Sequence, residues 1–378
     1  MYIYRKCPIL EALKTRSVLL LGPRRTGKSA FIRNEIKADK IYNLLLSDVF
    51  LRLSQRPSII RESLGPDDKL IVIDEIQKLP NLMDEVHFMI EELGIRFLLT
   101  GSSARKLKRT HTSLMAGRAK TVRLLPFVSA EIPKFDLEKV LLYGTLPPIY
   151  YSENPRDDLE SYVGDYLQEE IKAEALARNI EGFSRFLHRA ALSSGEVINF
   201  ESIANDAQVP ARTIREYYAV LQDTLIGTML HSVATSKRKA IAKGKFYFFD
   251  VGVVNALIGQ TSLSADTTAF GVAFEHFIFQ ELFGYINYQN LKQELCFWRS
   301  TTHQEVDFVI GKVAIEVKAS ANISNNDLKG LSLLAEDISL ERKIIISREI
   351  QKRKVGEVEI YPYRQFLEEL WANKIIFL

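Results

Sequence analysis

The chain has 378 residues, of which 47% are hydrophobic and 26% charged, so it is long enough for roughly two or three globular domains and is not disordered. Its formal net charge of +3 is too small to indicate a polyanionic partner by itself. Two distant cysteines, Cys7 and Cys296, exclude a disulfide framework and a cysteine-rich zinc site. No apolar run reaches the ~18 residues that cross a bilayer. We therefore expect a cytoplasmic protein without a membrane partner.

The N-terminal region alternates between apolar runs and helical patterns. The runs lack polar alternation and occupy residues 17–21, 70–73 and 97–99. Helical patterns begin after Lys28 and span residues 83–92. Buried strands separated by helices are typical of a parallel sheet that is covered on both faces. We therefore expect one α/β domain over residues 1–150.

A glycine-containing loop lies between the first strand and the first helix. Its sequence is Gly22-Pro23-Arg24-Arg25-Thr26-Gly27-Lys28-Ser29. It matches the phosphate-binding pattern G-x-x-x-x-G-K-[ST], in the strand–loop–helix context that this pattern requires. In such a loop the backbone N–H groups surround the phosphates, Lys28 reaches the β and γ oxygens, and Ser29 offers a hydroxyl to magnesium. The sequence thus predicts ATP and Mg²⁺ as cofactors.

Polar residues follow the two later strands of this domain. Asp74 and Glu75 end the run Leu70-Ile71-Val72-Ile73, as in a Walker B motif. We expect Asp74 to hold magnesium and Glu75 to polarise the attacking water. Thr100 ends the third strand and is a candidate sensor of the γ-phosphate. Ser102 is an alternative, and both residues are equally compatible with turn chemistry.

The middle of the chain changes to a mainly helical pattern. Residues 151–181 read as a helical lid or linker. Over residues 182–260 we expect three helices followed by two strands. The helical patterns lie at 183–192, 200–206 and 211–221, and the β-type runs at 226–234 and 245–250. Three helices and a hairpin are typical of a winged helix-turn-helix.

Basic residues gather at two places in this middle region. Arg212 and Arg215 begin the third helix, where a recognition helix meets DNA. The hairpin tip adds five candidate phosphate contacts, Lys237, Arg238, Lys239, Lys243 and Lys245. DNA is therefore an expected partner. The alternatives are solvated lysines that protect a sheet edge, and a winged helix that serves as a spacer between proteins.

Residues 261–378 contain a spaced set of carboxylates in a second α/β pattern. Glu275 lies on an opening helix, Asp307 in a strand-like run, and Glu316 and Lys318 on the next strand, where both face one side. This is the pattern of a restriction-endonuclease-like, PD-(D/E)xK domain. Asp307 and Glu316 would bind one or two Mg²⁺ or Mn²⁺ ions, Glu275 would add a carboxylate, and Lys318 would stabilise the attacking water or the phosphate. A salt-bridged strand pair and a nuclease fold kept only for binding are the alternatives.

Several blocks together resemble the prokaryotic AAA-type ATPases that are fused to a C-terminal domain long described as of unknown function. The blocks are Gly22 to Ser29, Ile73-Asp74-Glu75-Ile76-Gln77-Lys78-Leu79-Pro80, 99–103, 114–118, 271–275 and 305–318. The resemblance covers nearly the whole chain and implies a homo-oligomer, for example a hexamer. One departure is Gly144-Thr145-Leu146-Pro147, where the family usually has Gly-Gly-x-Pro.

The resemblance also implies an arginine that reaches the ATP of a neighbouring subunit. Arg118 follows the sensor strand and is the leading candidate, while a solvated arginine is the alternative. Three other arginines compete for the role, namely Arg105, Arg109 and Arg123. A second sensor arginine has no candidate.

Two functions follow from these patterns. The first is an oligomeric AAA-type ATPase that acts on DNA and carries a metal-dependent, nuclease-like C-terminal domain. The second is a nucleotide-controlled switch or scaffold, whose winged-helix and nuclease-like domains bind a protein partner without cleaving anything.

Overall fold

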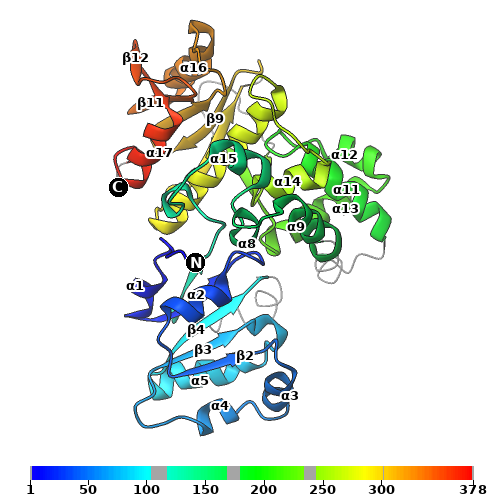
Figure 1. Ribbon diagram of the computed structural model, residues 1–378, viewed down its shortest axis with the longest axis vertical. Helices are drawn as coiled ribbons and strands as arrows, with labels where there is room; N and C mark the ends of the chain where they lie inside the picture. Colours follow the sequence, from blue (N-terminus) through cyan, green and yellow to red (C-terminus); the bar gives the residue numbers. More distant parts are fainter. Residues whose placement is uncertain (1, 104–116, 168–178, 234–243, 301, 377–378) are drawn as a thin grey trace. The chain divides into compact units, whose positions relative to one another are not determined.

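The computed structural model describes residues 2–103, 117–167, 179–233, 244–300 and 302–376 (Figure 1). The chain divides into two compact units. The first consists of Met1–Pro126 with Val220–Ile226, and the second of Phe127–Ala219 with Gly227–Leu378. Among the described residues, none of the helices combines the length and the apolar composition that crossing a bilayer requires.

The first unit is built on a five-stranded parallel sheet with the order β2-β3-β4-β1-β5. The strands are β1 (Ser17–Leu21), β2 (Lys40–Asn43), β3 (Leu70–Asp74), β4 (Arg96–Gly101) and β5 (Ala119–Arg123). The predicted parallel α/β fold is confirmed. Sequence analysis identified the three central strands, whose inner residues are buried, and missed β2 and β5. These two lie at the sheet edges and mix polar with apolar residues, so they lack a continuous apolar run.

The helices of the first unit pack their apolar faces against this sheet. They are α1 (Ile9–Leu13), α2 (Lys28–Glu35), α3 (Ser47–Gln55), α4 (Ile59–Glu62), the short η1 (Ile76–Lys78) and α5 (Leu82–Leu93). The core joins β3 to α5 through fully buried Ile71, Ile73 and Val86. α5 ends at Gly94, whose φ of 65° is the left-handed conformation that glycine adopts at helix ends. This core fixes the ends of β1, β3 and β4, where the predicted ATP residues lie.

The second unit begins with short helical segments. They are η2 (Ser129–Glu131), α7 (Leu137–Tyr143), α8 (Pro147–Tyr150), α9 (Pro155–Ser161) and the π-helical η3 (Tyr162–Leu167). Gly144 follows α7 with a φ of 73°, and a Cβ there would lie 1.9 Å from Asp250 Oδ1. Asp250 Oδ2 in turn accepts a hydrogen bond from Thr145 N at 2.8 Å. Gly144 begins the Gly-Thr-Leu-Pro segment that differs from the family pattern. A glycine is required there because no side chain fits beside Asp250.

Three helices and a hairpin follow, at the positions predicted from the sequence. The elements are α11 (Ile180–Leu192), α12 (Phe200–Ala207), α13 (Ala211–Asp223), β6 (Gly227–Ser232), β7 (Lys245–Phe248) and α14 (Val251–Ile258). Aromatic rings of α11 and α13 pack together, with Phe186 and Tyr218 at a centroid distance of 5.0 Å. β6 and β7 pair antiparallel.

The C-terminal region completes an eight-stranded sheet with the order β12-β13-β11-β10-β9-β8-β6-β7. Its elements are α15 (Thr268–Tyr288), β8 (Leu295–Arg299), β9 (Glu305–Ile310), β10 (Val313–Val317), η4 (Asn325–Leu328), α16 (Lys329–Asp337), β11 (Arg342–Ser347), β12 (Arg353–Val355), β13 (Val358–Pro362) and α17 (Tyr363–Trp371). β6 pairs parallel with β8, with His231 opposite Cys296. The β6–β7 hairpin therefore belongs to the same sheet as the C-terminal strands, although the sequence predicted a domain boundary between them at residue 260.

Candidate functional site

The loop Gly22–Ser29 connects β1 to α2 and is held closely by the surrounding backbone. A Cβ on Gly22 would lie 2.3 Å from the carbonyl oxygen of Leu124, so only glycine fits there. Gly27 caps the N-terminus of α2 with a φ of 96°, another conformation suited to glycine. The Lys28 ammonium is buried and donates to the carbonyl oxygens of Gly22 at 2.8 Å and Pro23 at 3.1 Å. The lysine thus lies across the loop that it is predicted to serve.

Arg5 braces this loop and was not identified from the sequence. Its guanidinium donates to Thr26 O at 2.7 Å and to Leu125 O at 2.6 Å. Thr26 Oγ1 also donates to Pro23 O at 2.8 Å. Because Arg5 contacts backbone carbonyls, no partner side chain in the sequence signals its role. Arg24 and Arg25 remain on the less buried side of the loop.

The end of β3 meets the start of α2 through a direct hydrogen bond. Ser29 Oγ donates to Asp74 Oδ2 at 3.0 Å. Thr100 Oγ1 donates to the other oxygen, Asp74 Oδ1, and accepts from Glu75 N at 3.1 Å. Fully buried Thr100 therefore fastens both Walker B residues. A hydroxyl and a carboxylate facing one another are a donor set that suits Mg²⁺, so the residues present fit this ion.

Glu75 is held by two further side chains. Gln77 Nε2 donates to Glu75 Oε2 and, at 3.0 Å, to Ser102 Oγ. Ser102 Oγ lies 3.3 Å from the same carboxylate oxygen. Glu75 itself has a left-handed φ of 64°, so its side chain leaves the strand direction. The sequence alone gave Gln77 no role, although it lies two residues after Glu75 in a segment that resembles the AAA-type ATPases.

The arginine candidates of this unit lie in different environments. Arg118 pairs with Glu91, and both side chains are partly exposed. Burial lowers the pKa of Arg123 below its ordinary value. Arg105 and Arg109 lie outside the described residues. The choice of an arginine finger stays a prediction.

In the second unit, β9 and β10 bring Asp307 and Glu316 together. Asp307 Oδ2 accepts a hydrogen bond from Val317 N at 2.7 Å, and Glu316 Oε1 accepts one from Lys318 Nζ at 2.6 Å. Burial, followed by the charges of Glu316 and Glu275, raises the pKa of Asp307 well above its usual range. Burial also raises the pKa of Glu316. Glu316 Oε2 is buried and has no hydrogen-bond partner among the described residues, an arrangement that costs free energy unless a ligand binds there.

Glu275 is held by Tyr247 and Lys245. Tyr247 Oη donates to Glu275 Oε1 at 2.5 Å, and Lys245 Nζ lies 3.6 Å from the same oxygen. The described residues contain no group of three or more His, Cys, Asp or Glu side chains arranged to hold a metal ion. The metal roles of Glu275, Asp307 and Glu316 stay a prediction.

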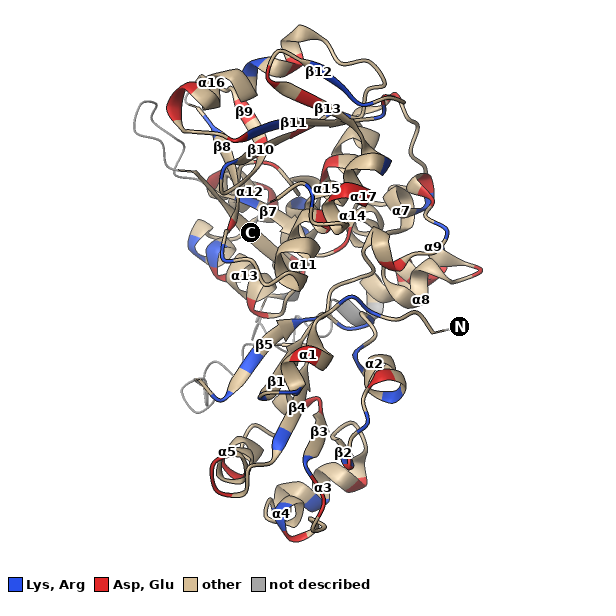
Figure 2. Cartoon of the chain, turned by 90° about the vertical axis from the view of Figure 1, so that its left-hand side faces the viewer, with Lys and Arg blue, Asp and Glu red and all other residues tan. Residues whose placement is uncertain are grey.

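The predicted DNA contacts fall into three groups: two arginines on α13, four basic residues of the predicted hairpin tip, and Lys245 on β7. Arg212 and Arg215 are exposed on α13, although Arg212 pairs with Glu216 at 3.4 Å and Arg215 lies over the ring of Phe200. Lys237, Arg238, Lys239 and Lys243 lie outside the described residues. Figure 2 shows Lys and Arg interspersed with Asp and Glu over both units.

Lys245 is a correction to the predicted DNA contacts. Its exposed fraction is only 2%, because all four residues of β7 are covered and its ammonium pairs with carboxylates inside the unit. It is therefore not available to a phosphate.

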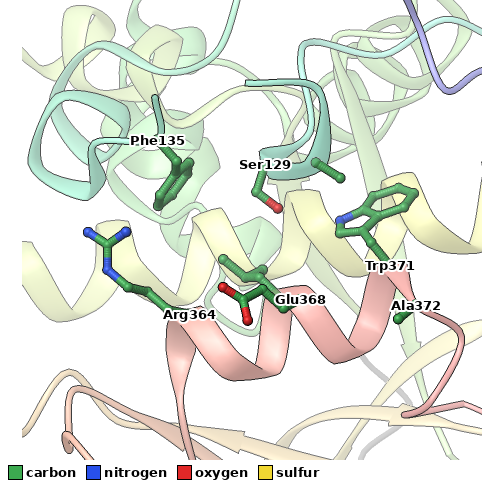
Figure 3. A pocket seen from close by; sticks show the side chains of 8 residues that line it. Ser129, Phe135, Arg364, Glu368, Trp371 and Ala372 are labelled. Carbon is green, nitrogen blue, oxygen red and sulfur yellow. The ribbon is translucent and has the colours of Figure 1, made fainter. Parts of the chain in front are cut away.

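A cavity of about 390 Å³ lies between η2 and α17, and no predicted site residue is among the described residues that line it (Figure 3). It is lined by Ser129, Ala130, Phe135, Arg364, Leu367, Glu368, Trp371 and Ala372. Beside it, buried Glu281 accepts hydrogen bonds from Ser129 N, Ser129 Oγ and Trp371 Nε1, each at 2.7 Å. No motif in the sequence marked these residues.

Three family descriptions match consecutive parts of the chain. Residues 14–132 match the family described as AAA domain, and residues 134–264 match a domain of unknown function, DUF8612. Residues 270–366 match another domain of unknown function, DUF4143.

Similar proteins are found in bacteria and archaea. The uncharacterized protein Rv2008c of Mycobacterium tuberculosis is 23% identical over 310 residues, which cover 78% of this chain and 67% of that protein. The uncharacterized protein MJ1544 of Methanocaldococcus jannaschii is 22% identical over 373 residues, which cover 88% and 81%.

Two solved structures align at low scores. The structure of Drosophila ORC bound to AT-rich DNA and Cdc6 has a TM-score of 0.24 at 10% identity, over 67% of this chain and 87% of that chain. Can2 from Sulfobacillus thermosulfidooxidans, in complex with cyclic tetra-adenylate, has a TM-score of 0.23 at 9% identity, over 95% and 99%. At these scores neither structure bears on the fold or the function. The match of residues 14–132 to the AAA domain family agrees with the parallel α/β fold of the first unit, and residues 270–366 are similar to DUF4143.

Proposed function

We propose that this chain hydrolyses ATP with Mg²⁺ at the loop Gly22–Ser29. The observation that carries the proposal is the 3.0 Å hydrogen bond from Ser29 Oγ to Asp74 Oδ2, because it joins the two magnesium-binding motifs at one point. The match of residues 14–132 to the AAA domain family supports it. Bound magnesium would neutralise phosphate charge as the γ-phosphoryl group leaves.

The side chains of this site have separate roles in the reaction. The N–H groups at the start of α2 and the Lys28 ammonium bind the phosphate oxygens of ATP. To do so, Lys28 leaves the carbonyl oxygens of Gly22 and Pro23 that it now contacts. Glu75 orients the attacking water and polarises it, while Gln77 and Ser102 hold the Glu75 carboxylate. Thr100 keeps Asp74 and Glu75 in register.

Two substitutions test these roles. Lys28→Ala should abolish ATP binding, whereas Glu75→Gln should keep binding and lower kcat by roughly 10²-fold or more, because it removes only the group that acts on water. Titration with a fluorescent nucleotide, next to steady-state phosphate release, separates the two effects. A fully active Glu75→Gln protein would overturn the role of Glu75.

The second unit supports a further proposed role in DNA metabolism. The observation that favours it is the buried Glu316 Oε2 beside Asp307, which has no partner within the described ranges, since a carboxylate oxygen of this kind suits a divalent cation. Asp307 and Glu316 would hold Mg²⁺ or Mn²⁺, which supplies Lewis-acid chemistry at a phosphodiester. Lys318 would stabilise the attacking water or the phosphate. The exposed Arg212 and Arg215 would contact DNA.

The purified protein should then be assayed on single-stranded, duplex and branched DNA, with and without ATP. Asp307→Ala should abolish metal-dependent cleavage and leave ATP hydrolysis largely intact. If the wild type binds metal but cuts no DNA under any nucleotide condition, the second function is favoured: a nucleotide-controlled switch or scaffold that binds a protein partner. Stimulation of ATP turnover by DNA would argue against that scaffold.

A further inference from the structure

The buried end of the β6–β7 hairpin enters the carboxylate cluster of the second unit. Lys245 is the first residue of β7 and the only charged residue of that strand, and its exposed fraction is 2%. β7 pairs with β6, and β6 pairs with β8, so the lysine is fixed by the same sheet that carries Asp307 and Glu316.

The Lys245 ammonium has carboxylate partners from two elements. It donates to Glu305 Oε1 at the start of β9 and lies 3.6 Å from Glu275 Oε1 on α15. The ring of Phe297 lies against it, with a distance of 5.5 Å from Nζ to the centroid. Burial by itself would lower the pKa of Lys245, but the attraction of Glu275, Asp307 and Glu305 outweighs burial and raises it. The lysine is therefore charged, and a buried charge is tolerated only when it is paired.

The surrounding charges nearly balance without any ligand. The acidic side chains are Glu275, Glu305, Asp307 and Glu316. The basic ones are Lys245, Lys318, which pairs with Glu316, and Arg299, which pairs with Glu305 at 3.3 Å. Of these groups, Lys245 alone pairs with Glu275, the carboxylate that the sequence assigns to the metal site. Glu316 Oε2 is buried and has no partner in the part of the chain that the structure describes.

We infer that Lys245 is the internal counter-cation of this cluster and opposes, by charge repulsion, the binding of a divalent metal ion to Asp307 and Glu316. A divalent ion beside Asp307 and Glu316 would repel the ammonium at short range in a poorly solvated site. Tight metal binding therefore requires Lys245 to withdraw, and since Lys245 begins β7, it requires the hairpin strand to shift. The inference rests on the proposed metal site and adds that the hairpin sets its affinity. Lys245 is accordingly a positioning residue, not a DNA contact.

The test is Mn²⁺ binding to the full chain, measured by isothermal titration calorimetry and by the electron paramagnetic resonance signal of free Mn²⁺. Lys245→Gln should bind Mn²⁺ at least about tenfold more tightly than the wild type, because one positive charge has been removed nearby. Lys245→Arg keeps the charge and should retain the wild-type affinity. Lys312→Gln is the matched control, since Lys312 pairs with Glu341 on the surface of the same unit.

The possible results distinguish a failure of the Lys245 inference from a failure of the proposed metal site. If Lys245→Gln binds Mn²⁺ no more tightly than the wild type and Lys312→Gln, the counter-cation role is wrong and the metal site stands. If neither the wild type nor Lys245→Gln binds Mn²⁺, both fail. Adding Asp307→Asn to Lys245→Gln should remove the gained affinity, and persistent tight binding would place the ion elsewhere and overturn the inference.

A second measurement applies if Lys245→Gln does not fold. In the wild type, saturating Mn²⁺ should speed hydrogen exchange at the backbone amides of residues 245–248, because the strand loosens as its lysine withdraws. Binding of Mn²⁺ with unchanged exchange in β7 would contradict the inference. ATP hydrolysis, recorded on the same samples, reports on the P-loop independently.

Discussion

Ser29 Oγ and Asp74 Oδ2 lie 3.0 Å apart, although 45 positions separate them in the sequence. The contact joins the first turn of α2 to the end of β3, and both atoms are expected magnesium ligands. We predict that Asp74→Asn raises the Mg²⁺ concentration needed for half-maximal ATP turnover by roughly tenfold or more, because it removes one charge from the ion. A Mg²⁺ titration of phosphate release measures this. Asp48→Asn, an exposed aspartate at the start of α3, is the control and should leave the midpoint unchanged.

Gln77 is predicted to position Glu75. Gln77→Ala should lower kcat by roughly 10- to 100-fold and leave KM for ATP nearly constant, because a misplaced catalytic group slows the reaction without weakening binding. Steady-state kinetics and a nucleotide titration distinguish these effects. Gln55→Ala changes an exposed glutamine of the same unit and should behave like the wild type. A kcat unaltered by Gln77→Ala would remove Gln77 from the mechanism.

Arg118 is predicted to act on the ATP of a neighbouring subunit. Arg118→Ala and Lys28→Ala should each be inactive, with a loss of roughly 10³-fold expected for a missing arginine finger. Mixing the two variants should restore some turnover through mixed interfaces. Glu91→Gln removes the partner of Arg118 and should leave turnover intact if that pair is only a surface contact. Absence of recovery, with mixed assembly demonstrated, would exclude a finger acting in trans.

The hairpin tip is predicted to bind DNA phosphates. Replacing Lys237, Arg238 and Lys239 with glutamine should weaken binding to all sequences alike. The slope of log affinity against log salt should fall by roughly 0.9 for each phosphate that the variant no longer neutralises. Fluorescence anisotropy over a salt series measures both effects. A control triple variant replaces exposed lysines elsewhere in the second unit, at Lys312, Lys354 and Lys374. Unchanged curves for the tip variant would exclude the hairpin as a DNA-binding element.

Glu281 should make the second unit less stable as the pH rises. Burial raises the pKa of Glu281 to about 7 in the folded chain, above its ordinary value of 4.5. The folded state therefore retains a proton that the unfolded state loses, and the stability present below pH 4.5 is lost as the pH rises through about 7. The linked change is about 3 kcal/mol.

Urea unfolding at pH 5 and pH 8 tests this expectation. The decrease in the free energy of unfolding between these pH values should be smaller in Glu281→Gln than in the wild type. Glu368→Gln, at an exposed position on α17, should keep the wild-type decrease. Equal decreases in all three proteins would show that Glu281 does not titrate in this range.

The local sequence was sufficient for the P-loop and its helix. The spacing of two glycines, a lysine and a serine fixes the backbone between a strand and a helix, so few other conformations compete. The central strands were equally predictable, because burial on both faces leaves a continuous apolar run in the sequence. For the same reason the edge strands β2 and β5, which are only partly covered, were missed.

Only the tertiary structure decided which charged side chains meet. Lys245 appears in the sequence among the basic residues of a hairpin tip, but β6 pairs with β8, some 65 residues further along the chain, and this pairing carries the lysine into the carboxylate cluster. The contacts of Gln77 with Ser102 and of Arg5 with Leu125 likewise join segments that are distant in the sequence. Such contacts depend on strand order and packing between distant segments, which hydrophobic periodicity does not encode, whereas a backbone motif is complete within a few consecutive residues.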